Sequence, residues 1–353
     1  MFSIMNLSIQ FKRAATRHAG RAAFPIAVLL FGFAAALPAQ SAAAAALPAL
    51  PPMPDAAAGA VSGRDGWWFL PAELRHLATA AAAADLTGES DPLPAIIAFH
   101  EALAAKGIRL VLLPVPEKSL IRADELFPPA EVAAAAGYAK ASARFVDALR
   151  KKGVDVLDVV PVLTAEAGRA ATSGDTVYCK TDSHYTPRTT AVLAGVIAAH
   201  LREVLPEVVK KSAAGPVPGP PTKLTIQGDL APPGTRETLA FQAVQKSATD
   251  AEPPASDPKS PALLLGDSHC LVFHAGGDML AKGGGLADHL GVELGSVPEV
   301  IAVRGSGATA ARVNLFRKAR KEPGFLGGKK VVIWCFAARE FTQSDGWKIV
   351  PMP

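Results

Sequence analysis

Apolar residues follow two alternating patterns through most of the chain. Residues 94–106 carry apolar side chains at helical spacing, and Gly107 then provides a favourable helix C-cap. The next residues, 108–115, form a continuous apolar run that is typical of a buried strand. The pair 131–152 and 154–160 repeats this order of helix and strand.

Further apolar runs predict the remaining strands of one sheet. They lie at 262–265, 300–303 and 330–336. Strands that alternate with helices usually pair in parallel, and parallel sheets are covered on both faces. The pattern therefore predicts an α/β fold with a mainly parallel sheet.

The alternation fails in a proline-rich insert at about residues 211–261. Ten of the 30 prolines fall there, and no regular periodicity is visible. About fifty residues of this kind exceed an ordinary connection between elements. Two interpretations remain open: a functional excursion from the sheet or a mobile insert.

The first 46 residues have the features of a secretory signal. Four basic residues and no acidic residue precede an apolar run from Ala22 to Leu37, and small residues follow it. The run is shorter than the ~20 residues that span a bilayer. Cleavage of the signal and an uncleaved N-terminal anchor both remain open, and either exports the rest of the chain. An Ala/Pro-rich linker, 47–63, then leads to the predicted folded domain, 64–353.

The net charge of +4 belongs to this leader. The whole chain has 36 basic and 32 acidic residues, and four basic residues lie in the leader, so the remainder is balanced. No basic block suited to nucleic acid occurs in the sequence. Length alone is compatible with two domains, but the pattern favours one α/β domain with a leader and an insert.

A serine directly follows one predicted strand. Gly266-Asp267-Ser268-His269 comes immediately after the apolar run 262–265. The carboxyl edge of a parallel sheet is where α/β proteins bind ligands, and Gly266 permits a tight turn there. Ser268 is therefore a candidate nucleophile, although a serine in this place also suits a helix N-cap.

A second group of residues supplies what a serine needs for activation. Asp182 and His184 lie just before Pro187, which suits the first turn of a helix that runs to Leu201. At this spacing Asp182 can accept the Nδ1 proton of His184, which leaves Nε2 to take the proton of a serine hydroxyl. The alternative is that Asp182 caps the helix while His184 packs beneath it.

Cys179, Cys270 and Cys335 are the only cysteines, and all lie near these motifs. A disulfide between Cys179 and Cys270 is one option in an oxidising compartment. Small buried thiols are the other option, which we favour. No His/Cys spacing resembles a zinc site, so we expect no metal and no cofactor.

Five motifs, in order, resemble the periplasmic alginate O-acetyltransferase proteins of the AlgJ/AlgX type. They are Gly66-Trp67-Trp68-Phe69-Leu70, Pro114-Val115-Pro116-Glu117-Lys118, Asp182-x-His184-Tyr185, Gly266-Asp267-Ser268-His269, and Val331 to Phe336 with Arg339-Glu340-Phe341. This resemblance implies a flavodoxin-like, three-layer α/β/α SGNH-hydrolase-like domain. In that family the Asp/His block precedes the Ser block, as it does here.

The resemblance also implies a Ser-His-Asp triad. Ser268 would be the nucleophile, His184 the general base and Asp182 its orienting partner. The implied reaction is acetyl transfer through an acetyl-serine to a sugar hydroxyl, and each step needs donors for an oxyanion. Besides the backbone of Ser268, a later loop offers Gly305 or Gly307 as a donor, or else forms a plain turn.

Four further side chains are candidate substrate contacts. SGNH enzymes place an Asn after a late strand, whereas this chain has Arg339, which replaces it electrostatically, binds an acidic sugar or forms a surface ion pair. Arg304 and Lys118 are candidates for attracting an anionic polymer, and Tyr185 for stacking on a sugar. Core packing is the alternative for Tyr185, and solvation for Lys118.

The sequence therefore predicts an exported, periplasmic O-acetyltransferase, or an acetyl-handling subunit, that acts on a secreted polysaccharide. Alginate is the family's best-known substrate, but no residue singles out mannuronate. Since acetyl-CoA is cytoplasmic, the resemblance implies a membrane-bound O-acyltransferase partner that delivers acetyl groups. An SGNH-type carbohydrate esterase or deacetylase and a non-catalytic polysaccharide-binding assembly protein are the alternatives.

Overall fold

The structure is a computed structural model that describes residues 46–53, 59–82, 85–210 and 215–353. Nearly all of the predicted secretory leader lies outside these residues. Within the described part, no helix combines the length and the apolar character that crossing a bilayer requires.

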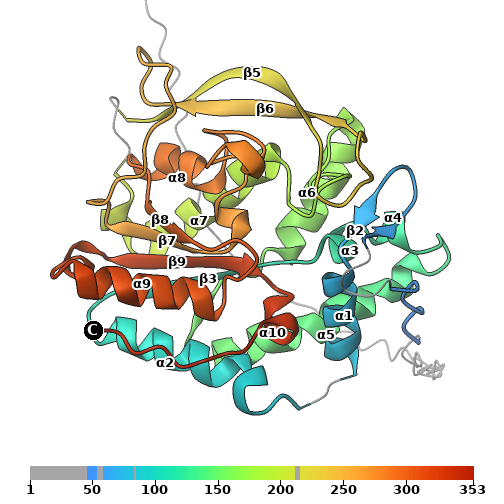
Figure 1. Ribbon diagram of the computed structural model, residues 1–353, viewed down its shortest axis with the longest axis horizontal. Helices are drawn as coiled ribbons and strands as arrows, with labels where there is room; N and C mark the ends of the chain where they lie inside the picture. The colour runs from blue at the N-terminus through green and yellow to red at the C-terminus, as the bar shows by residue number, and fades with distance from the viewer. Residues whose placement is uncertain (1–45, 54–58, 83–84, 211–214) are drawn as a thin grey trace, which may run out of the picture. The chain divides into compact units, whose positions relative to one another are not determined.

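A five-stranded parallel sheet forms the centre of the fold (Figure 1). Its spatial order is β4-β3-β9-β7-β8, and every neighbouring pair is parallel. The strands are β3 (Arg109–Val115), β4 (Asp155–Val156), β7 (Ala262–Gly266), β8 (Glu299–Ala302) and β9 (Val331–Ala337). The predicted α/β class with a mainly parallel sheet is confirmed.

Helices cover both faces of this sheet, which gives the expected three layers (Figure 1). Helices α6, α7 and α8 pack on one face, α2 and α9 pack on the other, and α1 and α5 contribute to both cores. The helices are α1 (Pro71–Ala81), α2 (Pro92–Ala104), α3 (Lys118–Ile121), α4 (Ala123–Leu126), α5 (Val132–Lys151), α6 (Val160–Ser173), α7 (Pro187–Val204), α8 (Leu286–Leu294), α9 (Thr309–Lys321) and α10 (Glu340–Gln343).

Successive side chains of a strand point alternately into the two hydrophobic cores, one on each face of the sheet. In β3, Val111 and Leu113 pack in the core that α7 and α8 cover, whereas Leu110 and Leu112 pack with α2 and α9. This division follows from the two-residue repeat of a strand. Because both faces are buried, the strand reads as a continuous apolar run instead of an alternating pattern.

The strand order explains why the Asp/His block precedes the serine. If the strands are counted from β7 to β9 and then from β3 to β4, their spatial order becomes 2-1-3-4-5. That is the doubly wound order of flavodoxin-like sheets. The chain is therefore a circularly permuted version in which the serine follows the third strand in sequence. The crevice where the strand order reverses lies between β7 and β9.

The strand predicted at 154–160 is mostly wrong, because only two of its residues form β4. The Asp158 carboxylate accepts a hydrogen bond from the Val160 N–H at 3.0 Å, and Pro161 occupies the first turn of α6. Both features favour the start of a helix. They therefore end the strand early.

Two antiparallel pairs lie outside the central sheet. They are β1 (Val61–Ser62) with β2 (Trp68–Phe69), and β5 (Val217–Ile226) with β6 (Glu237–Gln245). The second pair forms a hairpin inside the proline-rich insert and packs on α7 and α8 (Figure 1). The insert therefore contains a regular hairpin although its sequence shows no regular periodicity. The pairing of β5 with β6 shifts in register between Pro218 and Pro221, where the prolines have no N–H to donate.

A buried carboxyl lies just after β3, where Glu117 is 2% exposed. Neither carboxyl oxygen has a hydrogen-bond partner among the described residues, and Oε1 lies 3.2 Å from His76 Nε2. Burial raises the pKa of Glu117 to about 8 and lowers the pKa of His76 to about 3. Both side chains are therefore mainly neutral near neutral pH.

We predict that Glu117→Gln makes the stability less dependent on pH. The folded-state pKa of this acid is raised, so the folded protein keeps a proton that the unfolded chain releases above the ordinary value of 4.5. Stability therefore falls as the pH rises from about 4.5 to about 8. The loss is on the order of a few kcal/mol, since one pKa unit corresponds to about 1.4 kcal/mol.

Chemical denaturation at about pH 5 and about pH 9 measures this effect. The parent protein should lose more unfolding free energy between the two conditions than Glu117→Gln does. Glu101→Gln, which changes an exposed carboxylate on α2, is the control and should behave like the parent. Equal losses in the parent and Glu117→Gln would contradict the prediction.

Candidate active site

Ser268 stands at the carboxyl end of β7, after a turn that only glycine can make. A Cβ on Gly266 would lie 1.7 Å from the Cys335 carbonyl oxygen, so a side chain there would collide with β9. Ser268 then begins a short helical turn, Ser268–Cys270, that is capped by Asp267. This places Ser268, which is 9% exposed, beside the crevice between β7 and β9.

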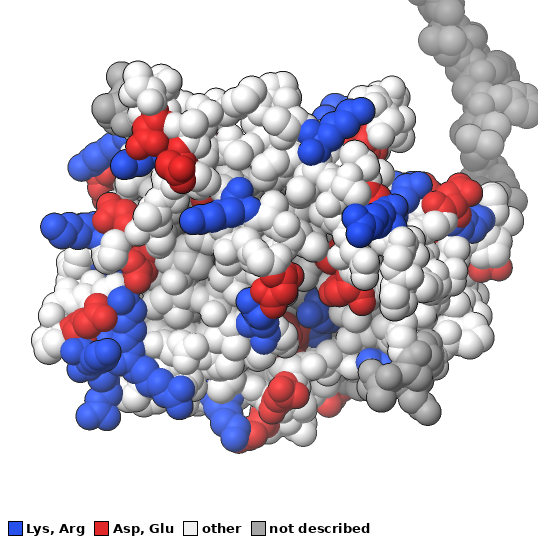
Figure 2. All heavy atoms as spheres, turned by 45° about the horizontal axis from the view of Figure 1, so that its top comes forward, with Lys and Arg blue, Asp and Glu red and all other residues white. Residues whose placement is uncertain are grey.

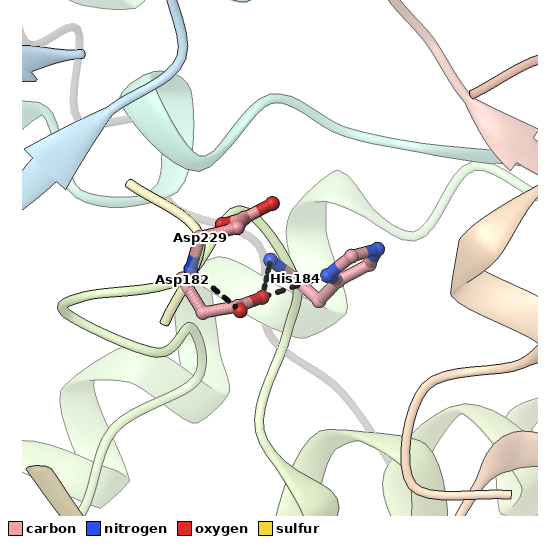
Figure 3. A group of neighbouring side chains, drawn as sticks. All are labelled: Asp182, His184 and Asp229. Carbon is pink, nitrogen blue, oxygen red and sulfur yellow. Dashed lines mark hydrogen bonds and ion pairs between the residues drawn. The ribbon is translucent and has the colours of Figure 1, made fainter. Parts of the chain in front are cut away.

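Asp182 and His184 lie in the loop before α7, and local hydrogen bonds set their geometry (Figure 3). Asp182 Oδ1 accepts a hydrogen bond from the backbone N–H of His184 at 3.0 Å and from its Nδ1 at 2.7 Å. An Asp side chain readily bonds the backbone two residues later. Because Nδ1 carries the ring proton and donates a hydrogen bond to Asp182, Nε2 of the neutral ring is left as an acceptor.

The His184 ring joins this loop to Ser268, which lies 84 residues later in the chain. Its Nε2 is 2.7 Å from Ser268 Oγ. The neighbouring Ser183 is engaged elsewhere, because its hydroxyl donates to Asp229 Oδ2 at 2.7 Å. The structure thus brings Asp182, His184 and Ser268 into one hydrogen-bonded chain, along which the imidazole can take the serine proton.

Burial and Asp182 act in opposite directions on the His184 imidazole. Burial lowers the pKa of His184, but the hydrogen bond and the charge of Asp182 outweigh it, so the pKa is raised. Burial likewise raises the pKa of Asp182, but the hydrogen bonds from His184 outweigh it and the pKa is lowered. An imidazolium formed at His184 is therefore stabilised by an ionised carboxylate.

The β5–β6 hairpin holds this loop through two carboxylates that the sequence pattern did not reveal. Glu237 accepts hydrogen bonds from the N–H groups of Lys180 and Thr181, both at 2.9 Å, and from the Thr181 hydroxyl at 2.7 Å. The Asp229 carboxylate accepts from the N–H and the hydroxyl of Ser183, both at 2.7 Å, and the Asp229 N–H donates to Asp182 Oδ2 at 3.1 Å. The insert that had no predicted structure therefore positions the Asp182 loop.

Asp182, His184 and Asp229 also have the spacing of a cation site. One ligand atom of each lies within 4.8 Å of the others (Figure 3). Hydrogen bonds already account for this grouping, because Asp182 accepts from His184 and Asp229, and Asp229 accepts from Ser183. Nothing beyond the spacing points to an ion.

The loop after β8 lies beside the turn that carries Ser268. A Cβ on Gly307 would lie 3.0 Å from the backbone nitrogen of Asp267 and 2.6 Å from Phe336 Cβ, so the two backbones approach closely. Gly305 has a φ of +77° and open space around it, which fits the plain-turn alternative. Of the two glycines, Gly307 therefore stays the candidate oxyanion donor.

The two arginines proposed as substrate contacts differ in exposure. Arg304 is exposed, and its guanidinium pairs with the Asp278 carboxylate, with one N–O distance of 2.7 Å. Arg339 is half-buried at the start of α10. Burial raises the pKa of Asp267, but the charge and hydrogen bond of His269 and then the charge of Arg339 lower it by more. The net shift of the Asp267 pKa is therefore downward. This effect of the Arg339 charge on Asp267 favours the electrostatic alternative for Arg339. Substrate contact by either arginine stays a prediction.

Lys118 and Tyr185 are wrong as predicted substrate contacts, because both side chains are fully buried. Lys118 Nζ donates to the carbonyl oxygens of Lys180 at 3.2 Å and Asp182 at 3.0 Å. The Tyr185 hydroxyl donates to the His269 carbonyl oxygen. Both residues therefore support the loops of the site from within the core.

The disulfide considered between Cys179 and Cys270 is not formed. All three cysteines are free and buried, and Cys270 Sγ donates to the Cys335 carbonyl oxygen at 3.5 Å. The favoured interpretation of small buried thiols is confirmed.

Ser268 is itself the middle residue of a second Asp-Ser-His tripeptide, in which the sequence pattern predicted no role for Asp267 or His269. Asp267 Oδ1 accepts from the His269 N–H at 2.8 Å and from its Nδ1 at 2.9 Å. These are the same two bonds that Asp182 makes with His184. The His184 and His269 ring centroids lie 5.0 Å apart. The signal that reveals this pair is the repeat of one tripeptide at 182–184 and 267–269.

Charges of both signs are interspersed on the face that Figure 2 shows, around a broad uncharged area. No single basic patch covers this face. The distribution agrees with the balance of acidic and basic residues beyond the leader.

We predict that Asp182→Asn lowers the pKa of His184. Asparagine keeps the shape of the side chain and one acceptor oxygen, but it removes the negative charge that outweighs burial. NMR titration of the imidazole nitrogens measures the shift. Asp278→Asn, which removes an exposed carboxylate paired with Arg304, is the control. A His184 pKa that stays unchanged in Asp182→Asn would refute this electrostatic account.

We also predict that Glu237→Ala loosens the Asp182 loop. The variant leaves two backbone N–H groups without their acceptor, which costs about 1–3 kcal/mol of unfolding free energy. Amide hydrogen exchange at Lys180 and Thr181 should become faster, as measured by NMR or mass spectrometry. Glu252→Ala, at an exposed position beyond the hairpin, is the control. Unchanged exchange at these two amides would show that the hairpin does not hold the loop.

A family model matches the sequence, and solved structures share the fold. The family model described as SGNH hydrolase-like domain, acetyltransferase AlgX matches residues 60–338. The structure is similar to the O-acetyltransferase domain of Pseudomonas putida AlgJ, with a TM-score of 0.57 and 20% identity over 81% of this chain and 92% of that chain. It is also similar to Pseudomonas aeruginosa AlgX, with a TM-score of 0.55 and 19% identity over 82% of this chain and 68% of that chain. No curated protein matches the sequence significantly.

At these identities the solved structures establish the fold, and the family model establishes the family. The model covers more than half of the chain and includes Asp182, His184 and Ser268. The resemblance predicted from the five motifs is therefore confirmed. The chain belongs to the AlgX family of SGNH hydrolase-like acetyltransferase domains.

Proposed function

We propose that this protein is an exported O-acetyltransferase that moves acetyl groups to hydroxyls of a secreted polysaccharide. The observation that carries the proposal is the hydrogen-bonded chain from Asp182 through His184 to Ser268, in a member of an acetyltransferase family. A serine hydroxyl is a weak nucleophile until a neighbouring base accepts its proton. The geometry supports His184 as that base and Asp182 as the carboxylate that orients it.

In the first step, Ser268 Oγ attacks the carbonyl carbon of an acetyl ester while its proton passes to His184 Nε2. Negative charge develops on the carbonyl oxygen, and the N–H groups of Ser268 and Gly307 are the proposed donors to it. The bond to the donor's alcohol oxygen then breaks, and that oxygen takes the proton from His184. The product is acetyl-Ser268.

In the second step, a sugar hydroxyl attacks the acetyl-Ser268 carbonyl carbon and gives its proton to His184 Nε2. The bond to Ser268 Oγ breaks, and Ser268 regains a proton from His184. An acetylated sugar leaves and the enzyme returns to its starting state. If water replaces the sugar in this step, the same residues perform ester hydrolysis.

The cellular setting of the reaction is also part of the proposal. The leader-like residues 1–46 support export to the periplasm. An acetyl donor outside the cytoplasm then requires a membrane-bound O-acyltransferase partner. Alginate is the first polysaccharide to test, because the related structures are AlgJ and AlgX proteins.

We predict that Ser268→Ala lowers acetyl transfer by at least about 1,000-fold, as expected when a catalytic nucleophile is removed. The purified protein is incubated with nitrophenyl acetate and an alginate oligosaccharide, and mass spectrometry detects the acetylated sugar. Ser173→Ala, at an exposed position at the end of α6, is the matched control and should keep full activity.

The same assay separates the alternatives. Release of acetate without acetylated sugar would favour a carbohydrate esterase. Binding of the oligosaccharide without any turnover would favour a non-catalytic assembly protein. Transfer that survives in Ser268→Ala would exclude this serine as the nucleophile.

A further inference from the structure

The proposed triad assigns no task to Asp267 and His269, the two residues that flank Ser268. Asp267 binds the backbone N–H and the Nδ1 of His269 just as Asp182 binds those of His184. In the first tripeptide this arrangement leaves Nε2 for Ser268. The same local geometry directs His269 Nε2 away from Asp267.

Contacts from β9 and from the loop before α7 hold the turn that carries His269. Asp267 is 1% exposed, and its Oδ2 accepts a hydrogen bond from the Ala337 N–H at 2.8 Å, which ties the turn to the end of β9. The buried Tyr185 hydroxyl donates to the carbonyl oxygen of His269. The position of the imidazole is therefore preorganised before any ligand arrives.

His269 Nε2 is available to a ligand. It makes no hydrogen bond to the described residues. Nε2 is not fully enclosed by the described residues, and His269 as a whole is 3% exposed. Burial lowers the pKa of His269 in spite of Asp267, and the charge of His184 lowers it further. The ring is therefore neutral at neutral pH, and Nε2 is a hydrogen-bond acceptor.

We propose that His269 Nε2 accepts a hydrogen bond from a second hydroxyl of the acceptor, next to the hydroxyl that His184 deprotonates. The two imidazole rings are 5.0 Å apart between centroids. Vicinal hydroxyl oxygens of a sugar ring lie about 3 Å apart, and each hydrogen bond adds about 3 Å, so one diol can span both rings. The inference rests on the proposed function and names its acceptor class, a vicinal diol.

This arrangement also discriminates against water. A water molecule at the acyl-serine fills the position of only one hydroxyl, whereas a diol occupies both imidazole nitrogens. Correct placement of a reacting hydroxyl accelerates its attack. His269 therefore favours transfer to a diol over hydrolysis.

The test compares two small acceptors, vicinal cis-cyclohexanediol and cyclohexanol, with nitrophenyl acetate as the donor. In the parent protein, the diol should be acetylated about tenfold faster than the alcohol, which is the effect of one well-placed hydrogen bond. His269→Asn keeps an amide N–H for Asp267 and removes Nε2, so it should abolish this preference. His269→Gln places an amide group nearer the Nε2 position and should restore part of it.

Intact-protein mass spectrometry measures the formation of acetyl-Ser268 in each protein, so that the diol preference is compared per acetyl-enzyme formed. A parent protein without diol preference, or a preference that persists in His269→Asn, would overturn the inference. The comparison of the diol with cyclohexanol in the parent protein needs no variant, so it tests the inference even if His269→Asn does not fold. Failure of the parent to form acetyl-Ser268 would instead overturn the proposed function, and the inference with it.

Discussion

The hydrogen bond that the Ser268 hydroxyl donates to His184 Nε2, 2.7 Å long, is the contact on which the rest of the site depends. It joins two loops that the sequence separates by 84 residues. The turn after β7 places Ser268 at the carboxyl edge of the parallel sheet, and the loop between α6 and α7 brings His184 to it. Gly266 is required for it, since only glycine lets the chain turn beside β9 and present Ser268.

The support beneath this contact is polar and almost entirely internal. Lys118 donates to the carbonyl of Asp182, Tyr185 donates to the carbonyl of His269, and Glu237 accepts from the Thr181 backbone. Such buried hydrogen bonds are costly to break, because each leaves an unpaired group in a poorly solvated place. They hold the imidazoles in position before substrate binds, which is the condition for rapid proton transfer.

Local sequence information predicts the parts of this structure that depend on neighbouring residues. Continuous apolar runs give the main strands, and the two-residue spacing of Asp182 and His184 gives their pairing. The early end of β4 was not predictable in this way, because Asp158 starts the following helix. The β5–β6 hairpin was not predictable either, because its prolines interrupt the apolar pattern of a strand. The burial of Lys118 and Tyr185 depends on tertiary packing that no local pattern contains. The repeated Asp-Ser-His tripeptide was visible in the sequence, but the hydrogen bond between Asp267 and His269 became evident only from the structure.

The central claim is that the Asp182 and His184 pair makes Ser268 a nucleophile for acetyl groups. Rapid quenching after mixing with nitrophenyl acetate, followed by proteolysis and mass spectrometry, locates the acetyl group directly. The account predicts that acetyl appears on the peptide containing Ser268 and leaves it when an oligosaccharide is added. Acetyl groups found only on other residues, or turnover with no acetyl on Ser268, would contradict it.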